Sequence, residues 1–246
     1  LDGSDWGATN TGVSVDANGV LSGSKFMVPD AAQATWIAVV GSDAAGDAVV
    51  ALVAGRDVAA QAQASHALID LTKRASTLDF TGVKAQRVLS GDKVASAIRD
   101  YLLIGALLTA AEAVGSTSAC LAGIVDYLKT RKQFGKLIGS FQALKHPTVD
   151  IYVGMEHSRS LVYHASSEID DGPLSAEAEV ACRMAKAKAS DTIQYAGDRS
   201  VQFHGGFGFT WECDSSLFIR RAAWSQQQFG DAMHHRKRLA PLLLDA

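Results

Sequence analysis

Two long helical segments meet at the stretch RKQFGKLIGSFQ, residues 131–142. Before this stretch, apolar side chains recur every three or four residues from Asp92 onward, which predicts one face of a helix of about 35 residues. After it, a second helix is expected to start at an N-cap on Ser140 and to end near Ile169, before the turn sequence Asp-Asp-Gly-Pro. Pro147 predicts a kink or a later start in this helix, because proline lacks the backbone N–H that a helix uses.

A third helix is expected to open at Ser175, which has the side chain of an N-cap. Glu177 and Glu179 would place negative charge in its first turn, where the helix dipole favours it. An alanine-rich face then leads to the glycine pair at residues 205–206, and residues 214–244 are expected to form one or two further helices. Long helices joined by short turns predict an antiparallel four-helix bundle.

The first part of the chain has the pattern of β-strands. Asn18-Gly19 separates two β-rich runs, which is typical of a tight hairpin. Further strands are expected at residues 35–40, 48–53 and 76–82. We therefore predict the fold class α+β: a small antiparallel β-domain over residues 1–91, incomplete at its start, followed by an antiparallel four-helix bundle over residues 92–246.

Composition narrows the class of protein. The chain has 246 residues, is 48% hydrophobic and carries a formal net charge of −3. Its apolar runs are short, so no membrane span is expected, and its first residues lack the pattern of a signal peptide. The 3 cysteines include no CxxC pair, which predicts reduced thiols and a cytoplasmic protein. The slightly acidic charge gives no reason to expect a nucleic acid partner.

The histidines do not form a metal-binding pattern. His157 and His164 lie on one predicted helix and His234 and His235 are adjacent, but neither pair has a carboxylate or cysteine at ligand spacing. We therefore predict no metal site. The basic run from His234 to Arg238 is interpreted as the solvated C-terminal half of a helix, where the helix dipole favours positive charge. The GxSxG, P-loop, HExxH and GxGxxG motifs are also missing from the sequence.

Two segments carry the groups that a dinucleotide diphosphate needs. In the first, Arg131 offers a planar fork of donors for phosphate and Phe134 offers a flat apolar surface. In the second, VQFHGGFGFT at residues 201–210, two adjacent glycines allow backbone N–H groups to approach a ligand closely. Glutamines in both segments can bind ribose or amide groups. The candidate binding residues are Arg131, Phe134, Gln142, Gln202, Gly205 and Gly206.

Both segments resemble the C-terminal signatures of acyl-CoA dehydrogenases, and LSGSKFMVPDA at residues 21–31 resembles a segment of that family's middle β-domain. The resemblance covers essentially the whole chain. It implies a middle β-domain followed by a helical bundle, FAD bound across a subunit interface, and a tetramer. It also implies that the candidate binding residues contact the ADP half of a neighbouring subunit's FAD.

The sequence departs from that family in three places. The family's N-terminal helical domain has no counterpart in these 246 residues. Met27-Val28-Pro29 stands where the family has a flavin-facing Trp-x-Thr, and proline cannot donate a hydrogen bond. In the family, a glutamate before a glycine near the C-terminus removes the substrate α-proton, and counting without gaps from Arg220 puts Phe229 at that position. The family's alternative position for this base falls near Gly105.

Two carboxylates remain as candidates for a displaced base. Asp231 lies two residues after Phe229, and Glu112 lies two helical turns along from Gly105. Helical carboxylates of this kind are more often structural than catalytic. We place the candidate catalytic role on Asp231 and expect Glu112 to be either buried and paired or at a subunit contact.

The resemblance implies a flavoprotein oxidoreductase acting on CH–CH groups, which desaturates an acyl-CoA thioester with FAD in fatty acid or steroid catabolism. The implied partners are the acyl-CoA substrate, the other subunits of a homo- or heterotetramer, and electron-transferring flavoprotein as electron acceptor. The alternative is a non-catalytic partner subunit that completes the FAD site of a heterotetrameric acyl-CoA dehydrogenase, because Phe229 replaces the usual glutamate. A helical scaffold without a flavin role would leave Arg131 and the glycine pair unexplained.

Overall fold

The structure is a computed structural model that describes residues 6, 12–59 and 62–244. The chain divides into two compact units, Leu1–Tyr101 and Leu102–Ala246, and the division falls inside helix α2 (Asp92–Thr130). Helix α2 begins at residue 92, the predicted start of the second domain. The prediction about a signal peptide concerns residues 1–4, which lie outside the described residues.

The first unit contains a seven-stranded sheet in the described part of the chain, with the order β5-β6-β2-β1-β3-β4-β7. The predicted hairpin is confirmed, since β1 and β2 pair antiparallel across a turn in which the Asp16 carboxylate accepts hydrogen bonds from the backbone N–H groups of Asn18 and Val20, each at 2.8 Å. The elements are β1 (Val13–Val15), β2 (Leu21–Pro29), β3 (Trp36–Ser42), β4 (Ala48–Ala54), α1 (Gly55–Ala59), β5 (Ala62–Ser65), β6 (Ala75–Asp79) and β7 (Arg87–Leu89).

The sheet differs from the predicted antiparallel β-domain in one pairing. Every neighbouring pair is antiparallel except β1 and β3, which run parallel. After β2 the chain reverses through a short 3-10 helix at Ala31–Gln33 and places β3 on the free edge of β1, so β3 has the direction of β1. The short strands β5 and β7 were not predicted. A core that includes the fully buried side chains of Leu21, Val53 and Phe80 holds the sheet together.

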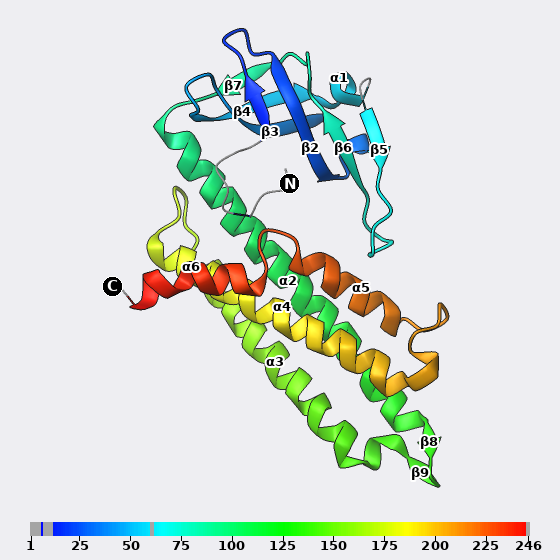
Figure 1. Cartoon of the computed structure of the whole chain (residues 1–246). Helices are drawn as coiled ribbons and strands as arrows, with labels where there is room; N and C mark the ends of the chain where they lie inside the picture. The colour runs from blue at the N-terminus through cyan, green and yellow to red at the C-terminus, as the bar shows by residue number, and fades with distance from the viewer. Residues whose placement is uncertain (1–5, 7–11, 60–61, 245–246) are drawn as a thin grey trace. The chain divides into compact units, whose positions relative to one another are not determined.

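The second unit is the predicted helical bundle, so the α+β fold class is confirmed. Helix α4 packs against α3, α5 and α6, and the Cys120 thiol of α2 donates to the Ala196 carbonyl of α4. The Ser175 N-cap is also confirmed, because its hydroxyl accepts from the Ala178 N–H at 3.0 Å. Figure 1 shows the antiparallel run of these long helices. Their bounds are α3 (Gln142–Ser167), α4 (Ala176–His204), α5 (Ser215–Gln226) and α6 (Ala232–Leu244).

The start of α3 corrects a prediction. Ser140 is not the N-cap, because it ends a 3-10 turn at Ile138–Ser140 and its hydroxyl donates to the Leu137 carbonyl at 2.7 Å. The capping position belongs to Phe141, which makes no side-chain cap hydrogen bond. The helix begins at Gln142 and continues through Pro147, so the proline does not delay its start.

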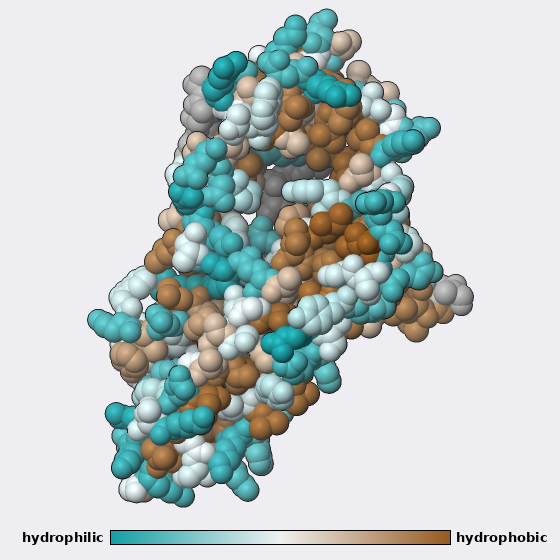
Figure 2. All heavy atoms as spheres, turned by 180° about the vertical axis from the view of Figure 1, so that it is seen from behind, coloured by the Kyte–Doolittle hydropathy of each residue, from teal (hydrophilic) through white to brown (hydrophobic). Residues whose placement is uncertain are grey.

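The apolar character of α2 bears on the prediction that the chain has no membrane span. Among the described residues, α2 is long and apolar enough by length and composition to cross a membrane, although Gly, Thr and Glu interrupt its apolar runs. The core helix of a bundle meets the same criteria, and α2 buries Leu103, Leu107 and Ala110 in the core shared with α3, α4 and α5. Other apolar side chains of the bundle stay exposed, including Leu108 and Tyr163, and Figure 2 shows hydrophobic patches between hydrophilic ones.

Candidate functional site

The stretch that joins α2 to α3 folds into a tight hairpin. Strand β8 (Lys132–Gln133) pairs antiparallel with β9 (Lys136–Leu137), so the loop consists of Phe134 and Gly135 alone. Their φ angles of 52° and 76° lie in the left-handed region that a two-residue type I′ turn requires. The Phe134 ring is 88% exposed and lies edge-on to the Phe141 ring, with centroids 6.1 Å apart. The hairpin therefore presents an aromatic surface at its tip.

The glycine pair lies in a turn that ends α4. Gly205 is the C-cap of the helix with φ 61°, a value that glycine adopts without strain. A Cβ atom added at Gly205 or Gly206 would meet no heavy atom within 4 Å, so open space surrounds this backbone. A Cβ at Gly208 would instead lie 2.4 Å from the Val201 carbonyl oxygen, so packing requires a glycine there. The first two glycines keep space open, whereas the third allows the turn to close.

The hairpin and the glycine turn line the same cavity, which has a volume of about 890 Å³. Most of the candidate binding residues come together there. Gln142 does not line it: this side chain is exposed in the first turn of α3, between Phe141 and Ala143, which do. The candidate residues that line the cavity are Arg131, Phe134, Gln202, Gly205 and Gly206.

The cavity has the electrostatic character of an anion site. Arg131 and His204 are the lining side chains that can carry positive charge, and neither Asp nor Glu is among the lining residues in the described part of the chain. A guanidinium forms paired hydrogen bonds with phosphate oxygens, and an aromatic ring such as Phe134 can cover a planar base. The residues present therefore fit the ADP half of a dinucleotide.

A second region joins Gly105 on α2 to Phe229, which follows α5. A Cβ at Gly105 would lie 2.3 Å from Cε1 of Phe229 and 2.6 Å from its Cδ1 and Cζ atoms. The phenyl ring therefore lies directly against the helix backbone at Gly105. The family resemblance implies these two positions for the catalytic base. The structure brings them together, and a phenyl ring fills the space between them.

The two candidate carboxylates have structural partners. The Asp231 carboxylate accepts from the His234 N–H at 2.7 Å and so caps α6. The Glu112 carboxylate accepts from Arg221 of α5 at 2.5 Å, and its side chain is 39% exposed. Glu112 is thus paired as expected but not buried. The catalytic role assigned to Asp231 stays a prediction, although its carboxylate already serves as a cap.

Lys186 on α4 is fully buried and was not singled out from the sequence. Its ammonium donates to the Ser190 hydroxyl at 2.9 Å and to the Ser225 carbonyl at 3.1 Å. Burial lowers the pKa of Lys186 to about 8, and the charge of Asp231 opposes that shift. The spacing of Cys182, Lys186 and Ser190 along one helical face was the available signal, but alanines dominate that stretch.

His235 on α6 contradicts the interpretation of the basic run as solvated. Its side chain is 2% exposed, its Nε2 lies 2.9 Å from the Phe229 carbonyl oxygen, and its Nδ1 is buried without a hydrogen-bond partner in the described structure. Burial, with smaller contributions from the charges of Lys186 and His234, lowers the pKa of His235 to about 3. The run also lies in the first half of α6, because the helix continues to Leu244. Within the run, Arg236 and the two residues after it are exposed, and His234 is half-buried.

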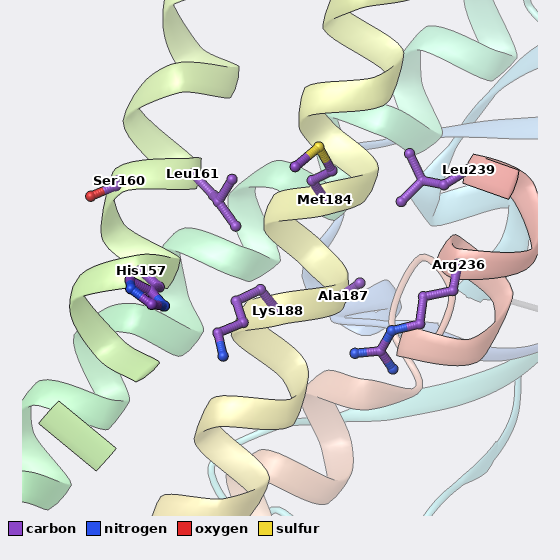
Figure 3. A pocket seen from close by; sticks show the side chains of 8 residues that line it. All are labelled: His157, Ser160, Leu161, Met184, Ala187, Lys188, Arg236 and Leu239. Atoms are coloured by element: carbon purple, nitrogen blue, oxygen red, sulfur yellow. The ribbon is translucent and has the colours of Figure 1, made fainter. Parts of the chain in front are cut away.

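A further cavity of about 460 Å³ lies between α3, α4 and α6 (Figure 3). Its apolar lining includes Leu161, Met184 and Leu239, and its polar lining includes His157 and Lys188. Arg236 also reaches this cavity, where it forms an ion pair with Asp191. None of the candidate binding residues lies there, so this cavity is separate from the Arg131 cavity.

The segment Met27-Val28-Pro29 lies at an irregular part of β2. The pairing of β2 with β6 shifts register between Lys25 and Val28, and Met27 has φ 56°. A left-handed residue at a bulge re-aims the neighbouring side chains of a strand. Pro29 pairs with Ala75 in register but has no N–H to donate.

The chain is similar to known acyl-CoA dehydrogenases in sequence and in fold. The sequence profile of the acyl-CoA dehydrogenase C-terminal domain matches residues 95–241. Acyl-CoA dehydrogenase IpdE2 of Mycolicibacterium smegmatis is 38% identical over 134 residues, which cover 54% of this chain and 40% of that protein. The chain spans about two fifths of the length of this relative and of IpdE2 from Mycobacterium tuberculosis.

Solved structures share the fold over nearly the whole chain. The Tcur3481-Tcur3483 steroid ACAD variant has 25% identity and a TM-score of 0.82, and the match covers 96% of this chain and 63% of that one. The ChsE4-ChsE5 complex from Mycobacterium tuberculosis has 23% identity and a TM-score of 0.83 over 97% of this chain and 66% of that one, which shows the fold alone. Because the profile match extends over more than half of the sequence, the chain belongs to the acyl-CoA dehydrogenase family.

Proposed function

We propose that this chain is a subunit of an FAD-dependent acyl-CoA dehydrogenase complex that holds the ADP half of the cofactor and leaves proton abstraction to a partner subunit. The observation that carries this proposal is the contact between Phe229 and Gly105, where a Cβ would lie 2.3 Å from the ring. A phenyl ring and a glycine occupy both family positions for the base, and neither can accept a proton.

The Arg131 cavity supports the cofactor part of the proposal. Bound FAD supplies a flavin ring that accepts a hydride from the thioester β-carbon. In this chain, Arg131 would bind the diphosphate, Phe134 would cover the adenine, and Gln202 would bind a ribose hydroxyl. Because the glycine turn lacks side chains and has open space around it, its backbone can approach the phosphates. Gln142 lies outside the cavity, so it would contact the cofactor only where the cofactor extends beyond the cavity rim.

The chemistry of desaturation supports the division of labour. Removal of the weakly acidic α-proton needs a carboxylate within hydrogen-bond reach of that carbon. The Asp231 carboxylate is bound to the His234 N–H, and the Glu112 carboxylate is bound to Arg221. Use of either as a base would require the loss of a cap or of an ion pair. A carboxylate supplied by a different subunit avoids both costs.

The name of a structural neighbour suggests an assembly and a substrate class. Because a structural neighbour is named as a steroid ACAD with two protein components, we propose a heteromeric dimer of dimers and a steroid-derived acyl-CoA as substrate. We further propose that the helical bundles lie at the centre of the assembly, that electron-transferring flavoprotein takes up the electrons, and that the complex is cytoplasmic.

Co-expression with a candidate partner subunit tests this proposal. The chain is purified alone and as a complex, and flavin absorbance per protein and particle mass by light scattering are measured. We expect a colourless or weakly yellow chain alone and a yellow tetramer with the partner. A monomer at micromolar concentration in the presence of FAD and partner would contradict the assembly. A chain that holds one FAD per subunit without a partner would contradict the proposal that a partner completes the flavin half of the site.

A further inference from the structure

His204 also lines the Arg131 cavity, although it is not among the candidate binding residues. It is the last residue of α4, directly before Gly205, and it is half-buried. Its ring stacks on Tyr127 of α2, with centroids 4.2 Å apart and planes inclined by 29°. Both rings line the cavity beside Arg131. The imidazole is therefore held in place at the wall where an anion would bind.

One hydrogen bond fixes which nitrogen of His204 can titrate. Its Nδ1 lies 2.7 Å from the Ser200 carbonyl oxygen. A carbonyl oxygen only accepts, so Nδ1 carries a proton in both the neutral and the charged ring. The second proton is gained or lost at Nε2. In the charged form, Nε2–H is a donor that remains free for a ligand.

The lining of the cavity offers an anion few charged groups besides His204. The other lining side chains that carry charge or titrate are Tyr127 on α2 and Arg131, the residue after α2. At the start of α3, the N-cap Phe141 and the helix residues Ala143 and Leu144 line the cavity and carry no charge. No carboxylate of the described chain lines the cavity to compete for the imidazolium.

We propose that His204 is a second, pH-dependent ligand for the diphosphate, which it binds through Nε2–H in its imidazolium form. Arg131 stays charged at all relevant pH values, so it provides a constant attraction, whereas His204 adds to it only when protonated. Since binding then takes up a proton, affinity rises as pH falls. This inference rests on the proposed function of the cavity. It predicts that the chain retains its cofactor more tightly as pH falls.

Calorimetric titration of the full chain with ADP-ribose tests the proposal. ADP-ribose carries adenosine and a diphosphate diester, whose charge does not change between about pH 5.5 and pH 8, the range in which histidine titrates. We expect binding about fivefold tighter at pH 6 than at pH 8, as for a partly exposed charge pair. In His204→Asn, the amide can still donate to the Ser200 carbonyl but cannot become charged, so the affinity should not depend on pH.

Control variants separate the possible failures. His157→Asn replaces an exposed histidine of α3 outside this cavity and should keep the wild-type pH dependence. If His204→Asn keeps that dependence too, His204 is not the titrating ligand, and only this inference falls. If Arg131→Ala binds ADP-ribose as tightly as the wild type, or if the wild type does not bind it, the nucleotide site itself is wrong. In that case the proposed function falls with the inference.

Discussion

The Arg131 cavity and the Phe229–Gly105 contact both belong to the helical unit, but they are built in opposite ways. In the cavity, Phe134 is exposed and a Cβ at Gly205 would meet nothing. At the contact, a Cβ at Gly105 would collide with a phenyl ring. The Arg131 cavity contains hydrogen-bond donors and open space, whereas apolar packing fills the region between Phe229 and Gly105. Under the proposed function, the open region binds the cofactor and the closed region lacks a group that could remove a proton.

This comparison has a physical consequence for mutations. Exposed groups around a cavity contribute little to folding, so their removal should change ligand binding alone. Buried groups behind Phe229 make hydrogen bonds and packing contacts, so their removal should change the free energy of unfolding. Substitutions at His235, Gly105 and Arg131 test this contrast. Their expected effects on the free energy of unfolding decrease in that order.

The largest effect on stability is expected from the protonation of His235 at low pH. Its pKa is lowered to about 3 in the folded chain, whereas an unfolded histidine titrates near pH 6.5. The folded state therefore loses stability as pH falls from 6.5 towards 3, by about 3 kcal/mol between pH 7 and pH 4. His235→Gln keeps a donor for the Phe229 carbonyl without a titrating ring and should lack this loss.

Urea unfolding at pH 7 and pH 4 measures the difference between wild type and variant. Carboxylates that protonate in this range affect both proteins and cancel in the comparison. His157→Gln, at an exposed histidine, serves as control and should behave as the wild type does. An equal loss of stability in His235→Gln and the wild type would mean that His235 is not buried in its neutral form.

A smaller effect is expected from Gly105→Ala. The added methyl group would overlap the Phe229 ring and should destabilise the chain by about 1–3 kcal/mol, less the helix propensity gained by alanine. Gly115→Ala on the same helix is the matched control, because a Cβ there meets nothing within 4 Å. That control should stabilise the chain by about 0.5–1 kcal/mol.

The double variant Gly105→Ala/Phe229→Gly identifies the source of the strain. It removes the ring, so the alanine should no longer carry its steric cost in urea unfolding. If Gly105→Ala is as stable as Gly115→Ala, the ring does not lie against the helix, and the region is open.

The smallest effect on stability is expected from Arg131→Ala, because this exposed side chain lies at the rim of a cavity. Unfolding free energy should change by less than about 0.5 kcal/mol. Flavin occupancy of the complex should nevertheless fall, since a charge-assisted hydrogen bond contributes about 1.5–3 kcal/mol to binding. Absorbance of the purified complex measures this, with Lys132→Ala as the control for charge alone. Unchanged flavin occupancy in Arg131→Ala would remove the evidence for the nucleotide site.

Local patterns predicted much of the fold. The Asn18-Gly19 turn, the long helix from Asp92 and the Ser175 cap all depend on interactions between residues close in sequence, and the structure contains each of them. The parallel pairing of β1 with β3 depends on where the chain returns after β2, which no local pattern specifies.

The candidate site residues show the same difference between local sequence patterns and packing of distant segments. Motif residues such as Arg131 and Gly205 came from two sequence segments and do line one cavity. The burial of Lys186 and His235 could not be predicted, because it depends on α4, α5 and α6 packing around charged side chains. A lysine in an alanine-rich helix and a histidine in a basic run both have the sequence context of exposed residues.

Acyl-CoA-dependent dye reduction tests the central claim most directly, namely that this chain lacks its own base. The wild type, Asp231→Asn and Glu112→Gln are each assayed as the isolated chain with added FAD and as the complex with a partner subunit. We predict no turnover above background for any isolated chain, and turnover of the complex that persists in Glu112→Gln and in Asp231→Asn. Robust turnover by the isolated chain that survives both substitutions would contradict the account, because a base would then exist that the Phe229 position does not reveal.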